Sequence, residues 1–436
     1  MPEARGLWTN WAGNQRCAPA AVEHPALEND LVALVKGAAA TGRTVKVVGA
    51  GHSFTDIACT DGVLVHLDRY GRVLSADPGT GRVTVQAGMP ITVLNEELAA
   101  RGLAMPNLGD IAYQTIAGAI STATHGTGRK LGNLSTQVVA LELVTADGSI
   151  VRASADEEPE VFDAARVGLG ALGILSTVTL GCVPAFNLHA EERPRRFDYL
   201  LEHLDELVDD NDHFEFFYVP HTGGALTKRN NATDEPARPR PRLRYWTDKV
   251  LMENAVFGAL CRVGRVRPSL IPRLNKLPIG GRRSDYVEPS HRVFASPRFV
   301  HFVEMEYAIP RSNAATALRR LKGFIDSSGL NISFPIEVRF VAADDLPLSP
   351  AQGRDTCYIA VHVYRGMPYE QYFRGVEAIA TELGGRPHWG KLHYQTAATL
   401  APRYPGWERF RAVRARLDPE GRFRNAYLDR VLGPPT

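Results

Sequence analysis

The chain has 436 residues, too many for a single ordinary hydrophobic core, so we expect two domains. A hydrophobic fraction of 44% and a charged fraction of 22% are typical of a soluble globular protein. Lysine and arginine number 50 against 48 acidic residues, and the net charge of +2 gives no global field that would favour nucleic acid.

Two further properties bear on location. Residues 1–10 lack the apolar segment of a secretory signal, and no run approaches the about 18 apolar residues of a membrane-spanning helix. The five cysteines are odd in number and lack CxxC spacing, which disfavours a disulfide framework or a zinc site and is typical of a reducing compartment. We therefore expect a cytoplasmic protein without a transmembrane segment, and peripheral attachment to a membrane stays open.

In the first 182 residues, short strands alternate with helices. Apolar residues at helical spacing predict a helix within residues 25–41, and the run Thr44–Val48 predicts a buried strand. Asp147-Gly148 is a strong turn signal and predicts a hairpin. Further strands are expected at Val63–Leu67, Arg72–Ala76, Arg82–Ala87, Gln137–Thr145, Ser149–Ala153 and Ile174–Leu180, and helices at Pro90–Leu98 and Pro159–Val167.

The strand Thr44–Val48 runs into two glycines and a histidine, at Gly49, Gly51 and His52. Glycine has no Cβ, so the backbone here can adopt positive φ and lie close to a ligand. A histidine on such a loop can donate or accept hydrogen bonds, act as a base, or form a covalent attachment. An ordinary turn histidine is the alternative, and this stretch alone does not separate the two.

A second stretch, Thr115–Thr127, is crowded with Gly, Ala, Ser and Thr. Small residues permit close approach, and hydroxyls with free backbone N–H groups suit an anion such as a pyrophosphate. A tightly packed helix followed by a glycine turn would give the same composition. Further along, residues 168–173 satisfy GxGxxG, but a helix is expected before them and a strand after them. The dinucleotide fingerprint requires the reverse order, so we reject a Rossmann site.

Three strands are expected in the second half at His301–Ile309, Phe334–Phe340 and Cys357–Tyr364. Side chains alternate between the two faces of a strand, so each face is defined. One set of faces bears Glu, Arg, His and Tyr, the residue types that bind and ionise substrates. A solvated face is the alternative, although Lys, Thr, Ser and Gln are more usual there.

Other polar segments are interpreted as structural. Asp234–Arg244 is rich in Pro and Arg and is expected to form a surface loop, and Asp209–Asp212 a turn, because it lacks the spacing of a calcium loop. A helix is expected at Tyr369–Leu383. His388 and His393 lie in a loop, and we expect no metal there.

In combination, these pieces resemble the aldonolactone oxidoreductases, which are flavoproteins of the vanillyl-alcohol-oxidase type. The pieces occur in the family's order and span nearly the whole chain. They are GHSFTDIACTDG at Gly51–Gly62, ATHGTG at Ala123–Gly128, Glu337-Val338-Arg339, HWGK at His388–Lys391, and DPEGRFRNAY at Asp418–Tyr427.

The resemblance implies an α+β protein of two domains, with a split FAD-binding (PCMH-type) domain at residues 12–182. A substrate domain with an antiparallel sheet would follow at 183–436, and its tail from about 415 would return to the FAD domain. FAD would be bound covalently through His52. The residues expected to contact FAD are Val48, Gly49, Ala50, Gly51, His52, Ser53, Phe54, Asn107, Gly109, Asp110, Gly118, Ala119, Thr122, Thr124, His125, Gly126, Gly128, Gly173 and Ile174.

The reaction implied is oxidation of an aldono-1,4-lactone at C2, with hydride transfer to flavin N5 and an ascorbate-type product. Glu337 would hydrogen-bond or deprotonate the C2 hydroxyl, Arg339 would stabilise negative charge, and Lys391 would stabilise the reduced flavin. His362 and Glu304 are further candidates for holding sugar hydroxyls. Oxygen is the preferred acceptor, and a dehydrogenase that uses cytochrome c, a quinone or a dye is the alternative, as is an alditol oxidase.

Overall fold

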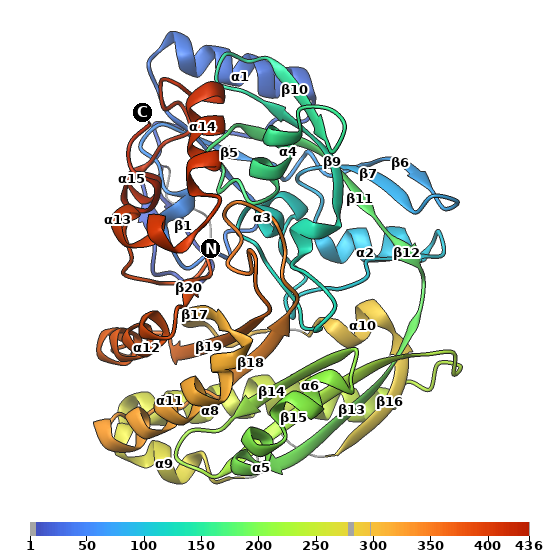
Figure 1. Ribbon diagram of the computed structural model, residues 1–436, viewed down its shortest axis with the longest axis vertical. Coiled ribbons are helices and arrows are strands. Elements are labelled where there is room, and N and C mark those ends of the chain that lie inside the picture. The colour runs from blue at the N-terminus through green and yellow to red at the C-terminus, as the bar shows by residue number, and fades with distance from the viewer. Residues whose placement is uncertain (1–5, 278–282, 297, 436) are drawn as a thin grey trace.

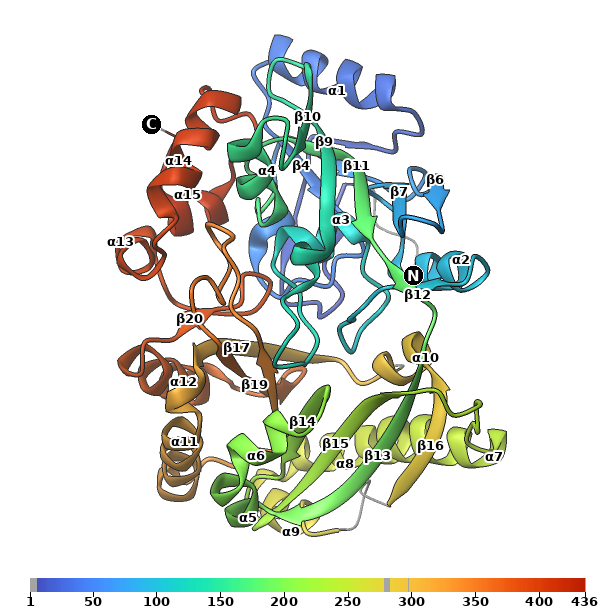
Figure 2. The same cartoon turned by 45° about the vertical axis from the view of Figure 1, so that its right-hand side comes forward.

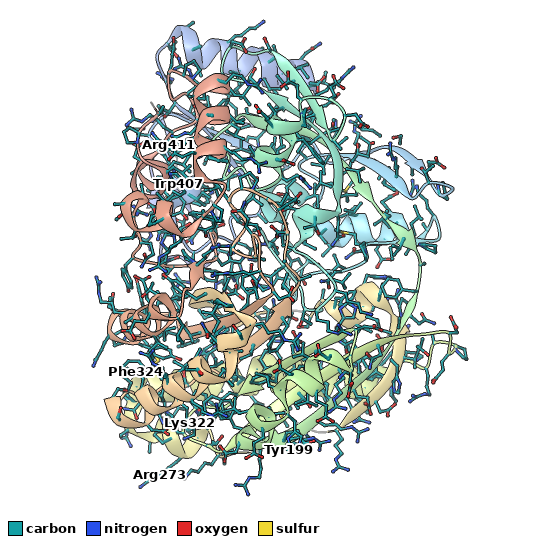
Figure 3. All side chains as sticks on the ribbon, viewed as in Figure 1. Tyr199, Arg273, Lys322, Phe324, Trp407 and Arg411 are labelled. Atoms are coloured by element: carbon teal, nitrogen blue, oxygen red, sulfur yellow. The ribbon has the colours of Figure 1, made fainter. Side chains whose placement is uncertain are left out.

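The computed structural model describes residues 6–277, 283–296 and 298–435. The molecule has two halves, seen one above the other in Figures 1 and 2. The upper half contains the early part of the chain together with the C-terminal helices, and the lower half contains one large sheet with helices against it. Side chains occupy the region between the halves in Figure 3, where Trp407 belongs to the upper half and Tyr199 lies at the lower rim.

The upper half is built on a parallel sheet of three strands and an antiparallel sheet of five. The order of the first is β3 (Ala21–Glu23), β5 (Val63–His66) and β4 (Val45–Val48). The order of the second is β10 (Ile150–Ser154), β9 (Val138–Val144), β11 (Ile174–Gly181), β7 (Arg82–Gln86) and β6 (Val73–Asp77). The helices are α1 (Glu28–Ala40), α2 (Ile91–Ala99), α3 (Ile116–Ser121) and α4 (Pro159–Arg166). Short strands lie at β1 (Trp8–Thr9), β2 (Arg16–Cys17), β8 (Leu103–Ala104) and β12 (Val183–Pro184).

The lower half contains, within the described residues, an antiparallel sheet of eight strands. Their order is β16 (Ser284–Pro289), β13 (Asn187–Arg196), β15 (Gly224–Thr233), β14 (His213–Tyr218), β18 (Ile336–Val341), β19 (Thr356–Tyr364), β17 (Phe302–Pro310) and β20 (Arg386–Pro387). The helices are α5 (Phe197–Glu202), α6 (Leu204–Asp209), α7 (Arg242–Tyr245), α8 (Phe257–Val266), α9 (Ile271–Leu274), α10 (Ser290–Phe294), α11 (Ala314–Ser328) and α12 (Glu370–Glu382), with a π-helical segment at Trp246–Val256.

The C-terminal segment returns to the upper half as α13 (Ala397–Leu400), α14 (Trp407–Leu417) and α15 (Ala426–Leu432). Two large hydrophobic cores result. One joins buried residues between Leu31 and Leu180 to others between Leu346 and Leu432, and the second lies mostly between Phe197 and Ala380. The end of the chain is therefore part of the core that its beginning forms.

The central strands of the large sheet have one apolar and one polar face, as the alternation predicts. On β18, Ile336, Val338 and Phe340 belong to the second core, which also contains buried residues of α11 and α12. Glu337 and Arg339 point to the opposite face, yet only 6% and 9% of their surfaces are exposed. The solvated-face alternative is therefore wrong, because the upper half covers this face.

The structure corrects two expected segments and defines the helix within Thr115–Thr127. Strand β18 begins at Ile336 instead of Phe334, because Pro335 has no N–H to donate to a neighbouring strand. Helix α3 ends at Ser121, and Ala123 then adopts a positive φ of 57°, which ends the helix. The expected loop Asp234–Arg244 runs into α7, and Arg240 within it is buried, with its guanidinium 3.9 Å from the ring centre of Tyr286.

Among the described residues, no helix is both long enough and apolar enough to cross a membrane. All five cysteines are unpaired.

The packing of α15 can be tested at Leu428, which is fully buried in the first core. Leu428→Ala is expected to lower the free energy of unfolding by about 3 kcal/mol, because it removes buried methyl groups and leaves a cavity. Leu243→Ala is the control, since that side chain is 74% exposed and its loss should change stability by less than about 0.5 kcal/mol. Urea denaturation followed by tryptophan fluorescence measures both, and equal small effects would contradict the docking of α15.

Candidate active site

A cavity of about 110 Å³ lies in the upper half, where three small-residue loops meet. The end of β4 and the loop after it supply residues 47–53, the segment around α3 supplies Gly118 and Thr122, and the segment after α4 supplies Gly168, Leu169, Gly170, Leu172 and Gly173. The GxGxxG segment therefore does line a cavity, although a helix precedes it and a strand follows it, as expected. Nine of the residues expected to contact FAD come together here: Val48, Gly49, Ala50, Gly51, His52, Ser53, Gly118, Thr122 and Gly173.

The lining of this smaller cavity favours an anion. Among the described residues, no acceptor receives a hydrogen bond from the backbone N–H groups of Gly51, His52 and Ser53. Lys46 also lines the cavity and is buried, with Nζ donating to the carbonyl oxygens of Gly170 at 3.1 Å and Phe423 at 3.2 Å. Burial lowers the pKa of Lys46 to about 7. Lys46 was not among the candidates, because a lysine within an apolar strand gives no sequence signal.

His52 is held by the N-terminal hairpin. The ring of Trp11 stacks on the His52 imidazole with centroids 5.2 Å apart, and the Trp11 N–H donates to the Gly51 carbonyl at 2.9 Å. The side chain of Asn10 donates to the carbonyl of Ser53 at 2.9 Å. Burial, with help from Lys391 and His301, lowers the pKa of His52 to about 4, so its imidazole is neutral at physiological pH. The stacking of Trp11 on His52 could not be predicted from the sequence, because it depends on how the N-terminal hairpin docks.

A larger cavity of about 340 Å³ lies between the halves, and the polar face of the large sheet lines one side of it. All five expected catalytic residues line it: Glu304, Glu337, Arg339, His362 and Lys391. Gly109, Asp110, Thr124 and His125, expected to contact FAD, also line this cavity and not the smaller one. Gln114 borders both cavities, and the Phe54 N–H donates to the Gly390 carbonyl at 2.7 Å, so the two cavities lie next to each other.

The remaining expected cofactor residues line neither cavity. Ala119 and Ile174 are fully buried in the first core, and Phe54 stacks on Phe302 with centroids 5.7 Å apart. The other three pack the loops together. They are Asn107, whose Oδ1 accepts from Leu108 N–H at 3.0 Å; Gly126, where a Cβ would lie 2.2 Å from the Leu108 carbonyl; and Gly128, whose N–H donates to the Phe340 carbonyl at 2.7 Å.

Glu304, on β17, is paired with two groups. Its carboxylate lies 2.5 Å from Lys391 Nζ and 3.5 Å from His362 Nε2. Burial alone would raise the pKa of Glu304, but Lys391 and His362 together outweigh it and lower the pKa to about 2. Glu304 is therefore ionised and fixes the Lys391 ammonium at the edge of the larger cavity.

Glu337 and Arg339 project from the same face of β18, as their spacing predicts. Their two-residue spacing on a strand suggests that they bracket a substrate without pairing with each other. That expectation is wrong in this structure, because Arg339 donates directly to Glu337. Arg339 Nε also donates to Glu215 at 3.2 Å, and Glu215 lies 3.1 Å from Lys228 Nζ. In a buried environment each charge requires a partner, and the guanidinium can serve both carboxylates at once. Burial raises the pKa of Glu337, although the charge of Arg339 opposes this.

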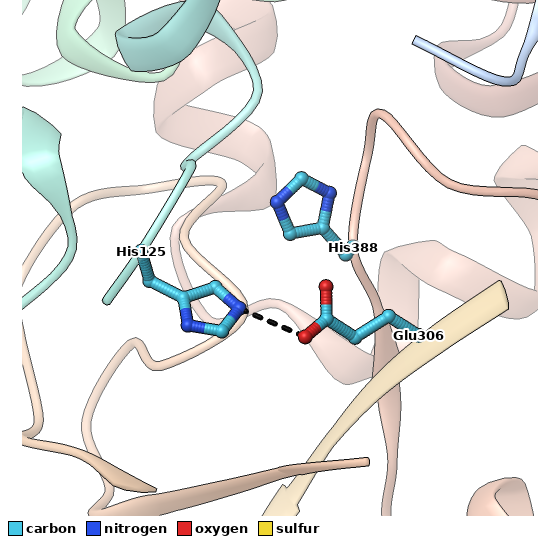
Figure 4. Close-up of side chains that lie close together, drawn as sticks. All are labelled: His125, Glu306 and His388. Carbon is cyan, nitrogen blue, oxygen red and sulfur yellow. Dashed lines mark hydrogen bonds and ion pairs between the residues drawn. The ribbon is translucent and has the colours of Figure 1, made fainter. Parts of the chain in front are cut away.

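Two further pairings were not anticipated, although Asp110 and His125 were expected to contact FAD. Asp110 pairs with Arg298 and lies 3.2 Å from Ser296 Oγ, which places it in the larger cavity. Glu306 and His388 come together with His125, and His125 Nε2 lies 3.1 Å from Glu306 Oε1 (Figure 4). The one available signal was that Glu306 shares a strand face with Glu304.

Comparison with known proteins agrees with this geometry. The family described as D-arabinono-1,4-lactone oxidase matches residues 178–431, and that described as FAD binding domain matches residues 19–154. L-gulono-1,4-lactone dehydrogenase of Mycobacterium tuberculosis (strain H37Rv) is 50% identical over 429 residues, covering 98% of this chain and 99% of the relative. L-gulonolactone oxidase of Bos taurus is 37% identical over 433 residues, covering 97% of each.

Among solved structures, a solvent-stable cholesterol oxidase aligns with a TM-score of 0.84 over 98% of this chain and 97% of its own. Cholesterol oxidase from B. sterolicum aligns with a TM-score of 0.82 over the same shares. Both are 18% identical to this chain, so they establish the fold alone. The chain therefore belongs to the D-arabinono-1,4-lactone oxidase family of FAD-dependent oxidoreductases, with the vanillyl-alcohol-oxidase-type fold that the sequence predicted.

Proposed function

We propose that this protein oxidises an aldono-1,4-lactone at C2 and that the buried polar face of the large sheet is its catalytic site. The observation that carries the proposal is the set of Glu337, Arg339 and Lys391 side chains around one cavity next to the glycine-lined one. The names of the relatives agree on the substrate class, since both act on a gulonolactone.

We also propose the division into an FAD-binding domain at 12–182 and a substrate domain at 183–436, with a returning tail. The two separate cores support it. The first core takes residues from Leu346 and Leu348 and from Trp389 onward, which supports a returning segment longer than the tail expected from about residue 415. A cytoplasmic location, inferred from the cysteine pattern, is part of the same proposal.

The residues around the smaller cavity fit FAD. The unused N–H groups at residues 51–53 and the Lys46 ammonium suit a pyrophosphate. Thr124 Oγ1, beside the larger cavity, is buried without a hydrogen-bond partner among the described residues, so a ligand could supply one. Residues 47–53, 118–122 and 168–173 would hold the cofactor. FAD, when bound, supplies the two-electron acceptor for the hydride from C2.

We infer that His52 is the covalent attachment site. Attachment requires a neutral imidazole as nucleophile, and burial keeps His52 neutral. The stacked Trp11 ring and the Asn10 contact to Ser53 fix the loop, so that the imidazole has a defined direction.

In the proposed reaction, the raised pKa of Glu337 suits it to accept the C2 hydroxyl proton. Arg339 polarises the lactone oxygens and stabilises the negative charge that develops on them. Lys391 places a cation beside the acceptor, held there by Glu304, while His362 and Glu304 bind sugar hydroxyls.

The covalent bond predicts a yellow polypeptide whose flavin fluorescence stays with the protein band after SDS denaturation. His52→Ala should lose this fluorescent band while it still binds FAD non-covalently, because most of the cavity lining persists. His24→Ala is the control, since His24 is partly exposed and pairs with Asp68. Release of all flavin from the denatured wild-type protein would refute the attachment.

Arg339→Ala should lower kcat by roughly 10²–10³-fold, the effect of losing one electrostatic donor to the transition state. Arg339→Lys should recover little, because an ammonium cannot reproduce the planar fork. Glu337→Gln keeps the shape and removes the base. Arg193→Ala is a matched control, because Arg193 also pairs with a glutamate two residues away, Glu191, on β13. Flavin reduction at the wild-type rate in Arg339→Ala and Glu337→Gln would move the catalytic site elsewhere.

The electron acceptor separates two versions of the proposal. Oxygen is the acceptor expected from the oxidases, whereas the 50% identity to a dehydrogenase favours a cytochrome c or quinone-type acceptor. We therefore expect stopped-flow reoxidation of the reduced enzyme to be faster with cytochrome c than with air. Faster reoxidation by air would establish the oxidase.

A further inference from the structure

Three side chains from separate segments converge beside the larger cavity (Figure 4). His125 follows α3, Glu306 lies on β17, and His388 follows β20. One ligand atom from each lies within 4.8 Å of the others, and the side chains of His125 and Glu306 are only 1% and 5% exposed. Such a cluster can hold a metal ion or a proton, and the hydrogen bonds around it decide between them.

The hydrogen bonds of His125 require an extra proton. Its Nδ1 lies 2.9 Å from the Gly126 carbonyl oxygen, which can only accept, so Nδ1 carries a hydrogen. A neutral imidazole then presents a lone pair at Nε2. That lone pair would face the Glu306 carboxylate at 3.1 Å, and an ionised carboxylate also only accepts. The contact is a hydrogen bond only if one more proton lies between the two groups.

His388 offers no lone pair to a metal ion. Its Nδ1 accepts the N–H of Gly390 at 3.1 Å, and burial lowers its pKa to about 3, so the ring is neutral. A neutral ring whose Nδ1 accepts must carry its hydrogen on Nε2. Both nitrogens are thus in use, and the cluster suits a proton better than a metal ion.

A count of the buried charges around the cluster also indicates that it holds one additional proton. Within the described part of the chain, six buried carboxylates lie on this face of the sheet and five cations pair with them, while Asp110 and Arg298 balance each other. An unbalanced buried charge is strongly unfavourable, so one more positive charge is required. The carboxylates are Glu192, Glu215, Glu288, Glu304, Glu306 and Glu337, and the cations are Lys228, Arg240, Lys249, Arg339 and Lys391.

His362 is the other histidine that could carry this charge. Its Nδ1 lies 3.3 Å from the Pro335 carbonyl and its Nε2 lies 3.5 Å from Glu304. Both contacts are longer than those of His125, and Glu304 already has Lys391 as its partner. The proton is therefore assigned to His125.

We propose that His125 and Glu306 hold one proton as a buried imidazolium–carboxylate pair, and that Glu306 is a positioning residue for Lys391. The Glu306 carbonyl accepts the His388 N–H at 3.0 Å, and the His388 carbonyl accepts the Lys391 N–H at 3.0 Å. One strand residue thus fixes both the FAD-side loop, through His125, and the loop that carries Lys391. Only the role of Lys391 rests on the proposed function.

Other charged and titratable groups face this pair from each neighbouring element. Burial would raise the pKa of Glu306, but His125, with smaller contributions from His388 and Lys391, outweighs it and holds the pKa well below its ordinary value. The stability that ionised Glu306 contributes is therefore complete above the unfolded pKa of about 4.3 and is lost as the pH falls through the lower folded value. The facing groups are Glu304 on β17, Arg339 on β18, Tyr358 on β19, and His388 and Lys391 on the loop after β20.

The proton can be observed directly by NMR of protein labelled with ¹⁵N-histidine, with or without substrate. We expect the His125 ring, assigned by its loss in His125→Gln, to show two protonated nitrogens from pH 6 to 8. His213 is an internal control, because its Nδ1 also faces a carbonyl, that of Thr127 at 2.7 Å, while it makes no ion pair among the described residues. Burial lowers the pKa of His213, so its ring should be neutral.

Glu306→Gln should convert the His125 signals to those of a neutral ring. If that variant does not fold, the wild-type spectrum decides by comparison with His213. A neutral His125 ring at pH 7 in the wild type would overturn the proposal. So would stoichiometric binding of Zn²⁺ or Co²⁺ that is lost in His388→Gln.

The positioning role is tested by kinetics. Glu306→Gln should lower kcat about tenfold with KM within about twofold, because it removes the negative charge that acts on Lys391, while the backbone hydrogen bonds and the substrate contacts persist. Glu377→Gln is the control, since Glu377 is also buried and bonded, to Tyr307 and Gln395, on the far side of β17. An unchanged kcat in Glu306→Gln would overturn the positioning role. Absence of lactone turnover in the wild type would refute the proposed function, while the NMR result would still decide the proton.

Discussion

The site depends on the burial of carboxylates on one face of an antiparallel sheet. Glu304, Glu306 and Glu337 are each at most 6% exposed, and a carboxylate at that depth is tolerated only with a charged or hydrogen-bonding partner. No single segment supplies all of these partners. Arg339 comes from the same strand as Glu337, Lys391 from the loop after β20, and His125 from the upper half. The polar face is therefore satisfied only when the two halves are packed together.

The close contact between the halves depends on glycine as well as on charge. A Cβ at Gly126 would lie 2.2 Å from the Leu108 carbonyl, so only glycine lets these two loops of the upper half pack together next to the sheet. At Gly128, φ is 150° and the N–H donates to the Phe340 carbonyl near the end of β18. This hydrogen bond joins the loop to the strand that carries Glu337 and Arg339. The small residues that suggested an anion site in the sequence therefore also allow the loops of the upper half to pack closely against the large sheet.

The sequence correctly predicted the features that depend on local periodicity, namely which side chains share a strand face and where helices and strands follow one another. Strand alternation placed Glu337 and Arg339 on one face, and the order of helix and strand around residues 168–173 excluded a Rossmann site. Contacts between distant segments could not be derived. Glu306 meets His125 across 181 positions of sequence, and the stacking of Trp11 on His52 depends on the hairpin's docking. Likewise, the pairing of Arg339 with Glu337 follows from burial, which a strand pattern does not measure.

The return of α14 and α15 to the first core has a consequence for synthesis. Phe410, Tyr427, Leu428 and Val431 are fully buried there, beside residues translated several hundred codons earlier. While the ribosome still holds the C-terminal segment, that core lacks the buried side chains of α14 and α15. The FAD-binding half therefore completes its core only after α14 and α15 have been synthesised and have docked, although most of its strands are made first.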